Sequence, residues 1–118
     1  MAQADSGLLH GTVELLILRS LTEEPRHGFA ISRILESRSG GVVVLKDAAL
    51  YQALHRMERQ GWIESEWGLS EKGKRAKFYQ LTPAGAKRLG REAAAWRRYA
   101  DAVARILAPE TDPEAETA

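Results

Sequence analysis

The spacing of the apolar residues changes at Gly61, and this change does most to limit the folds open to the chain. Before Gly61, apolar residues recur every three or four positions, which is typical of amphipathic helices. After it they alternate with polar residues in 62–67 and again in 77–81, which predicts a β-hairpin. The helical spacing returns after Thr82-Pro83, a threonine cap followed by proline and hence a strong helix start. The predicted order is helices, a hairpin and a final helix.

The first helix is predicted over residues 8–21, where the apolar residues form two stripes. One stripe can face the core. The other, through Leu8, Leu15 and Leu18, needs a separate cover, because a helix that is apolar on most sides must be buried on most sides. A chain of 118 residues has little material for that, so the second stripe favours contact with another subunit. Pro25 is expected to end this helix.

A second helix is predicted from Gly28 to the glycines at 40–41, with Phe29 and Leu35 among the residues on its core face. The β-branched stretch 42–45 is too short for a helix and predicts a brief strand or an extended link.

The third helix is predicted to have Asp47 as its N-cap and to stop at Gly61. Leu50, Leu54 and Met57 lie at i, i+4 and i+7 and therefore face the core. The other side carries an unusual set of polar residues for a helix that needs only to be soluble: Tyr51, Gln52, His55, Arg56 and Arg59. Arginine can pair bidentately with guanine and glutamine with adenine, so this side is a candidate for reading DNA bases. Taken alone, it is equally consistent with a solvated surface.

The predicted hairpin has a long tip, residues 68–76, and the tip is basic. Four cations and no acid lie between residues 72 and 77: Lys72, Lys74, Arg75 and Lys77. A charged tip is often only a soluble loop, but the lack of a compensating acid favours contact with phosphates. Such a tip would hold DNA without reading its sequence.

The last helix is predicted from Pro83 to about Leu107, roughly 37 Å long. Six of its apolar residues are spaced 4, 3, 4, 3 and 4 apart, the repeat of a coiled-coil seam: Leu89, Ala93, Trp96, Ala100, Val103 and Leu107. A helix of this length cannot lie wholly on so small a body. A homodimer is the simplest cover, with Leu8 and Leu15 of the first helix adding to the interface.

The net charge of +1 conceals an asymmetry. Residues 110–118 hold four of the 16 acids and no base, which leaves 17 bases against 12 acids in residues 1–109. This predicts a basic body with a short acidic tail that is disordered.

Several classes of protein are not expected. Cysteine is absent, which excludes disulfides and thiolate metal sites, and the apolar runs are far shorter than the roughly 20 residues needed to cross a bilayer. We therefore expect a cytoplasmic protein with no membrane segment, metal or cofactor. His55 and Glu58 have a metal-like spacing, but no second pair completes a site; His10 and His27 are expected to cap or pack beside helices. Without a nucleophile and its base, a phosphate-binding glycine loop or paired carboxylates, an enzyme is not expected.

Three helices followed by a hairpin is the order of a winged helix-turn-helix, whose third helix enters the major groove while the hairpin, or wing, lies along neighbouring phosphates. The expected fold is mostly α, in the α+β winged helix-turn-helix class, with a three-helix core, a two-stranded β-wing and a long C-terminal dimerisation helix. The expected divisions are a flexible arm (1–7), a DNA-binding domain (8–81), a dimerisation helix (82–108) and an acidic disordered tail (109–118).

Four stretches together resemble a known family. They are "GTVELLILRSLTEEPRHGFAI", "LYQALHRMERQGWIESEW", "KRAKFYQLTPAG" and the long last helix. From about Leu8 to Leu107 the chain resembles the PadR family of bacterial transcriptional regulators. The resemblance implies a winged-helix repressor that dimerises through its last and often its first helix, and that leaves DNA when a small molecule binds. It also implies that Tyr51, which matches the motif tyrosine, contacts DNA.

The resemblance also bears on Trp96. In multidrug-binding relatives a tryptophan on the last helix stacks on flat aromatic effectors, which makes Trp96 a candidate effector platform; the simpler interpretation is that it packs the dimer. At the start of the third helix, members commonly carry Gly-Ser/Thr-Leu-Tyr-Pro, whereas this chain has Ala48-Ala49-Leu50-Tyr51-Gln52. The hydroxyl is missing at Ala49 and a glutamine replaces the proline, so the usual operator of the family is not assumed.

The sequence thus predicts a sequence-specific DNA-binding regulator, most simply a dimeric repressor of a pseudo-palindromic operator. Its expected partners are double-stranded DNA, a second copy of the chain and a small hydrophobic or aromatic effector. The expected DNA contacts are Lys46, Tyr51, Gln52, His55, Arg56, Arg59, Lys72, Lys74, Arg75 and Lys77. The competing hypothesis is a winged-helix protein docking module that does not bind DNA.

Overall fold

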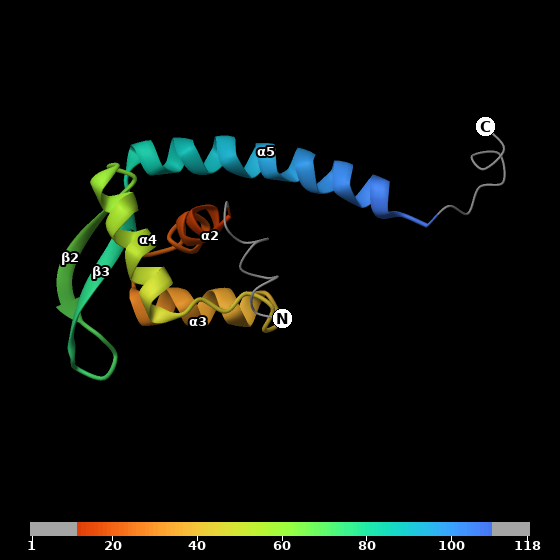
Figure 1. Ribbon diagram of the computed structural model, residues 1–118. Helices are drawn as coiled ribbons and strands as arrows, with labels where there is room; N and C mark the ends of the chain where they lie inside the picture. The colour runs from red at the N-terminus through yellow and green to blue at the C-terminus, as the bar shows by residue number, and fades with distance from the viewer. Residues whose placement is uncertain (1–11, 110–118) are drawn as a thin grey trace, which may run out of the picture.

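The computed structural model describes residues 12–109, which form four helices and a three-stranded antiparallel sheet. In chain order the elements are α2 (Val13–Ser20), β1 (Arg26–His27), α3 (Gly28–Arg38), α4 (Asp47–Arg59), β2 (Ile63–Leu69), β3 (Arg75–Leu81) and α5 (Pro83–Leu107). Figure 1 shows α2, α3 and α4 packed together, the sheet along one side and α5 above them. This is the mostly helical α+β winged-helix fold that the order of the elements predicted.

The core lies where α2, α3 and α4 meet the sheet. Ile17, Ile31, Leu54 and Met57 are fully buried there, and each such side chain contributes about 1.5–3 kcal/mol relative to an exposed one. The prediction that Leu18 faces another subunit is wrong, because it is only 1% exposed within this chain. The reason is that α2 contacts α3, α4 and α5 at once and so buries more than one stripe.

The first helix ends earlier than predicted. α2 stops at Ser20, and Pro25 comes after an intervening turn, so the prediction that Pro25 ends the helix is wrong. The carbonyl of Ser20 accepts a hydrogen bond from Arg26 Nε at 2.7 Å, which satisfies a helix-end acceptor from outside the helix.

α3 begins at Gly28 as predicted. His27 is its N-cap and Nδ1 accepts from the Ala30 amide at 3.1 Å, which confirms the expected capping role. The prediction that Phe29 faces the core is wrong, because its side chain is 60% exposed. Helical geometry puts it about 100° from the buried position one residue earlier, Gly28. It stacks instead on the His27 ring at the surface.

α4 buries Leu50, Leu54 and Met57, as predicted. Its N-cap is Lys46, and Asp47 is the first helical residue, so the predicted cap is wrong by one position. A carboxylate in the first turn still favours the positive end of the helix dipole. After the helix, Gly61 adopts the predicted left-handed conformation with φ 82°.

The sheet has the strand order β1-β3-β2. β2 and β3 pair from Ile63↔Leu81 to Leu69↔Arg75, so the connecting loop is only residues 70–74 and the predicted tip 68–76 was too long. We refer to β2, this loop and β3 as the wing. The third strand, β1, was not predicted, because two residues are too few to show a period of two.

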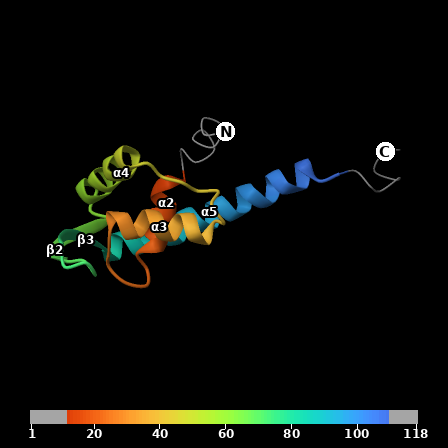
Figure 2. The ribbon, with the colours of Figure 1, turned by 90° about the horizontal axis from the view of Figure 1, so that it is seen from below.

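The start of α5 is held firmly against the body. Thr82 Oγ1 accepts from the Gly85 amide at 3.0 Å, the predicted cap, and the helix runs to Leu107 as expected. Gly85 is required at its position, since a Cβ there would collide with the carbonyl of Trp62. Farther along, α5 projects past the other helices (Figures 1 and 2). Within residues 12–109, no helix is both long enough and apolar enough to cross a membrane.

Candidate nucleic-acid interface

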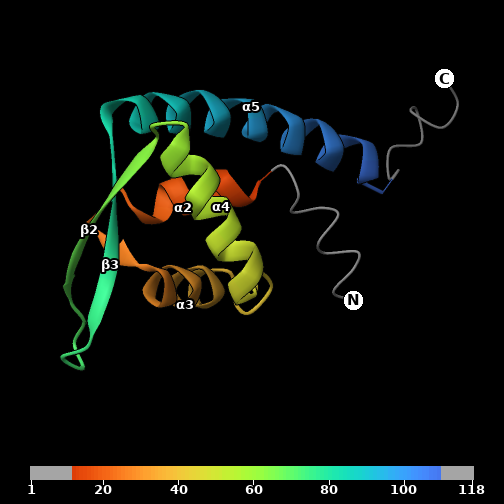
Figure 3. The same cartoon turned by 60° about the vertical axis from the view of Figure 1, so that its left-hand side comes forward.

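The outer side of α4 is polar and is exposed among residues 12–109. Figure 3 shows α4 at the front of the molecule beside the wing. Gln52, His55 and Arg59 are exposed on it, roughly opposite the core residues. Within residues 12–109, none of the three makes a side-chain hydrogen bond or ion pair with another residue. We call this side, with Tyr51 and Arg56 on its two edges, the reading face.

Tyr51 lies on the edge of the reading face nearer the wing. Its ring packs across Gly28 at the start of α3, so closely that a Cβ on Gly28 would collide with the ring and hydroxyl. The side chain nevertheless remains 42% exposed. Gly28 thus lets α3 and α4 approach each other and sets the direction of Tyr51, a contact that the sequence did not reveal.

Arg56 lies on the other edge and already has a partner. Its Nε donates to the Glu14 carboxylate of α2 at 2.9 Å, with side chains 49% and 28% exposed. A pair this exposed contributes at most about 1 kcal/mol. The contact occupies Nε, which leaves the terminal Nη groups for a further acceptor such as a guanine edge.

The basic residues of the wing divide between the loop and β3. Lys72 and Lys74 lie in the loop, and Arg75 and Lys77 belong to β3. The Arg75 guanidinium lies 4.5 Å from the centre of the Trp67 ring on β2, a cation–π contact that restricts it. Lys46 is exposed at the start of α4. The predicted contacts therefore lie on two elements, the wing and α4.

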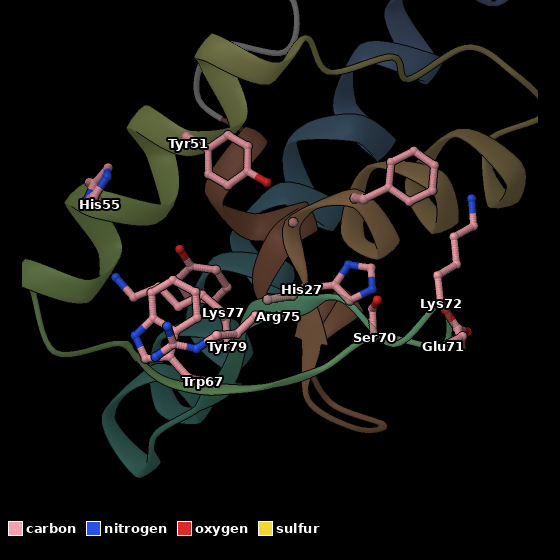
Figure 4. A pocket seen from close by; sticks show the side chains of 13 residues that line it. His27, Tyr51, His55, Trp67, Ser70, Glu71, Lys72, Arg75, Lys77 and Tyr79 are labelled. Carbon is pink, nitrogen blue, oxygen red and sulfur yellow. The ribbon is translucent and has the colours of Figure 1, made fainter.

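A concavity of about 550 Å³ joins these two elements to the first turn of α3. Its walls carry six aromatic or imidazole side chains: His27, Phe29, Tyr51, His55, Trp67 and Tyr79. Figure 4 shows Tyr51 on α4, Trp67 and Tyr79 on the wing and His27 before α3. Three cations, Lys72, Arg75 and Lys77, line it against one carboxylate, Glu71. The concavity is therefore suited to an anion that also presents apolar surface.

Tyr79 is a lining residue that the sequence reasoning missed. It is 4% exposed, and the described residues provide no hydrogen-bond partner for its hydroxyl. Burial raises the pKa of this hydroxyl above its ordinary 10.0, with Glu58 and Tyr51 acting in the same direction, so it is a neutral donor near neutral pH. On an alternating strand Tyr79 resembles a core residue, and the hydroxyl of a tyrosine in place of phenylalanine was the one available signal.

A family model matches most of the described fold. Residues 17–91, more than half of the chain, match the model of the Transcriptional regulator PadR-like family. The chain belongs to the PadR-like family. The match runs from α2 through the reading face and the wing into the first part of α5. The chain is therefore a transcriptional regulator and not an enzyme, and the resemblance seen in the sequence is confirmed.

Two curated relatives of this PadR-like chain are themselves uncharacterized. Protein X of Lysinibacillus sphaericus is 31% identical over 80 residues, which cover 68% of this chain and 73% of that protein. A 37.1 kDa protein in transposon TN4556 of Streptomyces fradiae is 36% identical over 97 residues, which cover 82% of this chain. The match spans only 26% of that second protein.

Solved structures agree with the PadR-like assignment over nearly the whole described fold. A transcriptional regulator from Clostridium thermocellum has a TM-score of 0.79 at 29% identity, covering 87% of this chain and 100% of that one. A PadR-like transcriptional regulator from Bacillus cereus has a TM-score of 0.78 at 27% identity, with coverages of 89% and 100%. A PadR family regulator from Eggerthella lenta has a TM-score of 0.75 at 30% identity, with coverages of 94% and 93%.

The residues of the predicted dimer seam of this PadR-like regulator differ in how deeply they are buried along α5. Leu89 packs against the core of its own chain, and Ala93, Ala100 and Val103 are half-buried. Trp96 and Leu107 remain 47% and 74% exposed. Two further apolar residues that were not predicted, Tyr99 and Ile106, are exposed on the flank of the seam. Of the first-helix residues, Leu15 is half-buried, while Leu8 lies outside the described residues, as does His10.

The pair His55 and Glu58 does not form part of a metal site within residues 12–109, where no group of three metal-ligating side chains comes together. Glu58 instead accepts a hydrogen bond from Ser65 Oγ at 2.7 Å, which ties α4 to β2. In this PadR-like fold that contact holds the reading face at a fixed distance from the wing.

Proposed function

We propose that the protein is a cytoplasmic, dimeric repressor that binds a pseudo-palindromic operator in double-stranded DNA. One observation supports this most directly. Tyr51 and His55 of α4 border the same concavity as three basic residues of the wing, Lys72, Arg75 and Lys77. A solvated helix would not need cations arranged on a neighbouring hairpin, whereas a DNA duplex presents base edges and phosphates side by side.

The two elements have different tasks in this proposal. Gln52 and Arg56 suit adenine and guanine edges in the major groove, where bidentate pairs discriminate between bases. Lys46, His55, Arg59 and the wing cations Lys72, Lys74, Arg75 and Lys77 neutralise phosphates, and Tyr51 donates to one. The wing supplies affinity and the reading face supplies sequence preference.

The dimer completes the proposal. Residues 8–81 form the DNA-binding part, residues 82–108 the dimerisation helix, and 1–7 and 109–118 the two tails. The exposed apolar side chains of α5 support this, because Trp96 and Leu107 remain 47% and 74% exposed among residues 12–109. Two copies joined along α5 would present two reading faces to successive major grooves on one side of a duplex.

Trp96 provides a route for release by a small hydrophobic or aromatic molecule. At the dimer centre its half-exposed ring could stack on a planar effector and shift the spacing of the two reading faces. In a variant whose other tryptophans, Trp62 and Trp67, are phenylalanine, such a compound should quench the emission, and it should lower the DNA affinity of the unaltered chain. Lack of quenching across a broad panel of compounds would leave Trp96 as a packing residue.

The experiment that tests the function is selection of bound sites from random duplex DNA, followed by affinity measurements over a range of salt. We expect a pseudo-palindrome, and a slope of log K against log salt near −5 if about six phosphates are contacted. Absence of any retained duplex at low salt, together with tight binding to a protein partner, would identify a docking module instead.

A further inference from the structure

We infer that the concavity between α4 and the wing seats one backbone phosphate of the bound DNA together with its sugar, with the Tyr79 hydroxyl, which is open to the concavity, donating to the phosphate. This inference rests on the proposed function and specifies where one strand of the duplex runs. It assigns DNA-contact roles to Tyr79, Phe29 and Trp67, which the sequence did not suggest.

The Tyr79 hydroxyl is the first reason. Its residue is 96% buried, since only 4% is exposed, and it lines the concavity. Figure 4 shows its oxygen on the side of the ring that faces Tyr51 and α4. The hydroxyl has no hydrogen-bond partner among the described residues and is not a buried unpaired group, so it is open to the concavity and can donate to an acceptor that arrives there. Because the raised pKa keeps the Tyr79 hydroxyl neutral at physiological pH, the hydroxyl can donate a hydrogen bond to an anion.

The path of the DNA strand is the second reason. A helix in the major groove and a wing on the neighbouring backbone must lie on opposite sides of one sugar-phosphate strand. Such a strand has to pass between α4 and β3, which is where the concavity lies. Tyr51 stands at one edge, fixed against Gly28, and Lys77 at the other.

The composition of the walls is the third reason. Three cations face one carboxylate, which favours an anion, while Phe29 and Trp67 expose 60% and 56% of their surfaces at the rim. Each ring already has a guanidinium over one face, Arg33 over Phe29 and Arg75 over Trp67. A nucleotide backbone unit combines an anion with an apolar sugar, so it matches both features of the walls.

The test compares Tyr79→Phe with Tyr99→Phe, the same loss of a hydroxyl on an exposed part of α5. Affinity is measured for a duplex obtained by selection, and then for duplexes in which one phosphate at a time is a neutral methylphosphonate. We expect Tyr79→Phe to bind about tenfold more weakly, as for a lost hydrogen bond to a charged group, and Tyr99→Phe to bind like the unaltered chain. The thermal midpoint of unfolding should be unchanged in both.

The methylphosphonate series locates the contact. One position should weaken the unaltered chain severalfold and weaken Tyr79→Phe much less, because the donor to that phosphate is already absent. Equal affinity of Tyr79→Phe and the unaltered chain, or equal losses at every position, would overturn the phosphate seat and leave the proposed function standing. A lower thermal midpoint of Tyr79→Phe would also count against it, since the hydroxyl would then have a structural partner. If the unaltered chain bound no duplex at all, both proposals would fail.

Discussion

Both α4 and α5 are amphipathic helices with one side that the described part of the chain leaves exposed, but the two exposed sides have opposite chemistry. The side of α4 carries an amide, an imidazole and a guanidinium at Gln52, His55 and Arg59. That of α5 carries large apolar side chains, of which Trp96 and Leu107 are the predicted examples. A polar side with unoccupied donors suits a charged, hydrated partner, whereas an exposed apolar stripe suits another apolar stripe. The difference indicates that the two helices serve two different partners.

The largest expected effect comes from placing a charge in the α5 stripe. Val103→Asp would bury two unpaired carboxylates per dimer, each at a cost of about 3 kcal/mol or more. We expect monomers in sedimentation and loss of binding to a two-half-site duplex. Ala94→Asp is the matched control, because Ala94 lies two and a half turns before Val103, on the opposite and exposed side of α5. An unchanged mass for Val103→Asp would refute the seam and remove the contrast between the two helices.

A smaller effect is expected from neutralising the wing. Changing its four cations (Lys72, Lys74, Arg75 and Lys77) to glutamine should flatten the slope of log K against log salt by about 3 to 4, and weaken DNA binding by about a hundredfold at moderate salt. Four exposed cations of α5, changed in the same way, give a control with the same net charge: Lys87, Arg91, Arg97 and Arg98. If both variants lose the same slope, net charge alone is responsible and the wing has no particular role.

The third test asks whether α4 reads bases. Arg56→Ala should weaken binding by about 1–3 kcal/mol at one base pair and relax the preference there. Arg56→Lys keeps the charge but loses both the bidentate guanidinium and the Nε contact with Glu14. It should therefore relax the base preference while keeping the slope of log K against log salt. Selection profiles of the three proteins provide the measurement. A uniform loss over all sequences would make Arg56 a phosphate contact.

The smallest effect should come from a site that neither helix uses. The hydrogen bond from Arg38 and its charge, with help from Arg26, hold the pKa of Glu23 below its ordinary 4.5. A lowered pKa stabilises the fold above the ordinary value, and this stabilisation is lost as the pH falls through the folded value. Glu23→Gln should therefore lower the thermal midpoint slightly near neutral pH and not in acid.

Circular dichroism at a series of pH values measures this difference, with the exposed Glu36→Gln as the control. DNA affinity and sedimentation mass should be unchanged in both variants. A deficit of Glu23→Gln that grows in acid would show that the ion pairs with Arg26 and Arg38 are not its cause.

Much of the fold could be predicted because its signals are local. The burial of Leu50, Leu54 and Met57 follows from helical spacing alone, and the cap at Thr82 follows from one hydroxyl and the proline after it. Errors appeared where the signal was short or depended on distant contacts. The strand β1 has two residues, and the end of α2 depends on Arg26 reaching back to the Ser20 carbonyl.

The candidate site divides in the same way. Gln52, His55 and Arg59 were predictable, because their positions relative to the core residues of α4 are set by 3.6 residues per turn. Tyr79 and the pairing of Arg56 with Glu14 were not, since each depends on how α4 sits against another element. Phe29 was placed on the wrong side because an aromatic residue in an apolar run looks like core until its neighbours are known.

By itself the sequence determined the order of the elements, the solvent-exposed side of α4 and the apolar stripe of α5. These features follow from the spacing of apolar and polar side chains along a single segment. Only the tertiary structure decided that α4, the wing and the first turn of α3 line one concavity with the Tyr79 hydroxyl in its wall. That arrangement depends on two close approaches, Tyr51 across Gly28 and Gly85 beneath Trp62, between residues far apart in the chain. The periodicity of one segment carries no information about such distances.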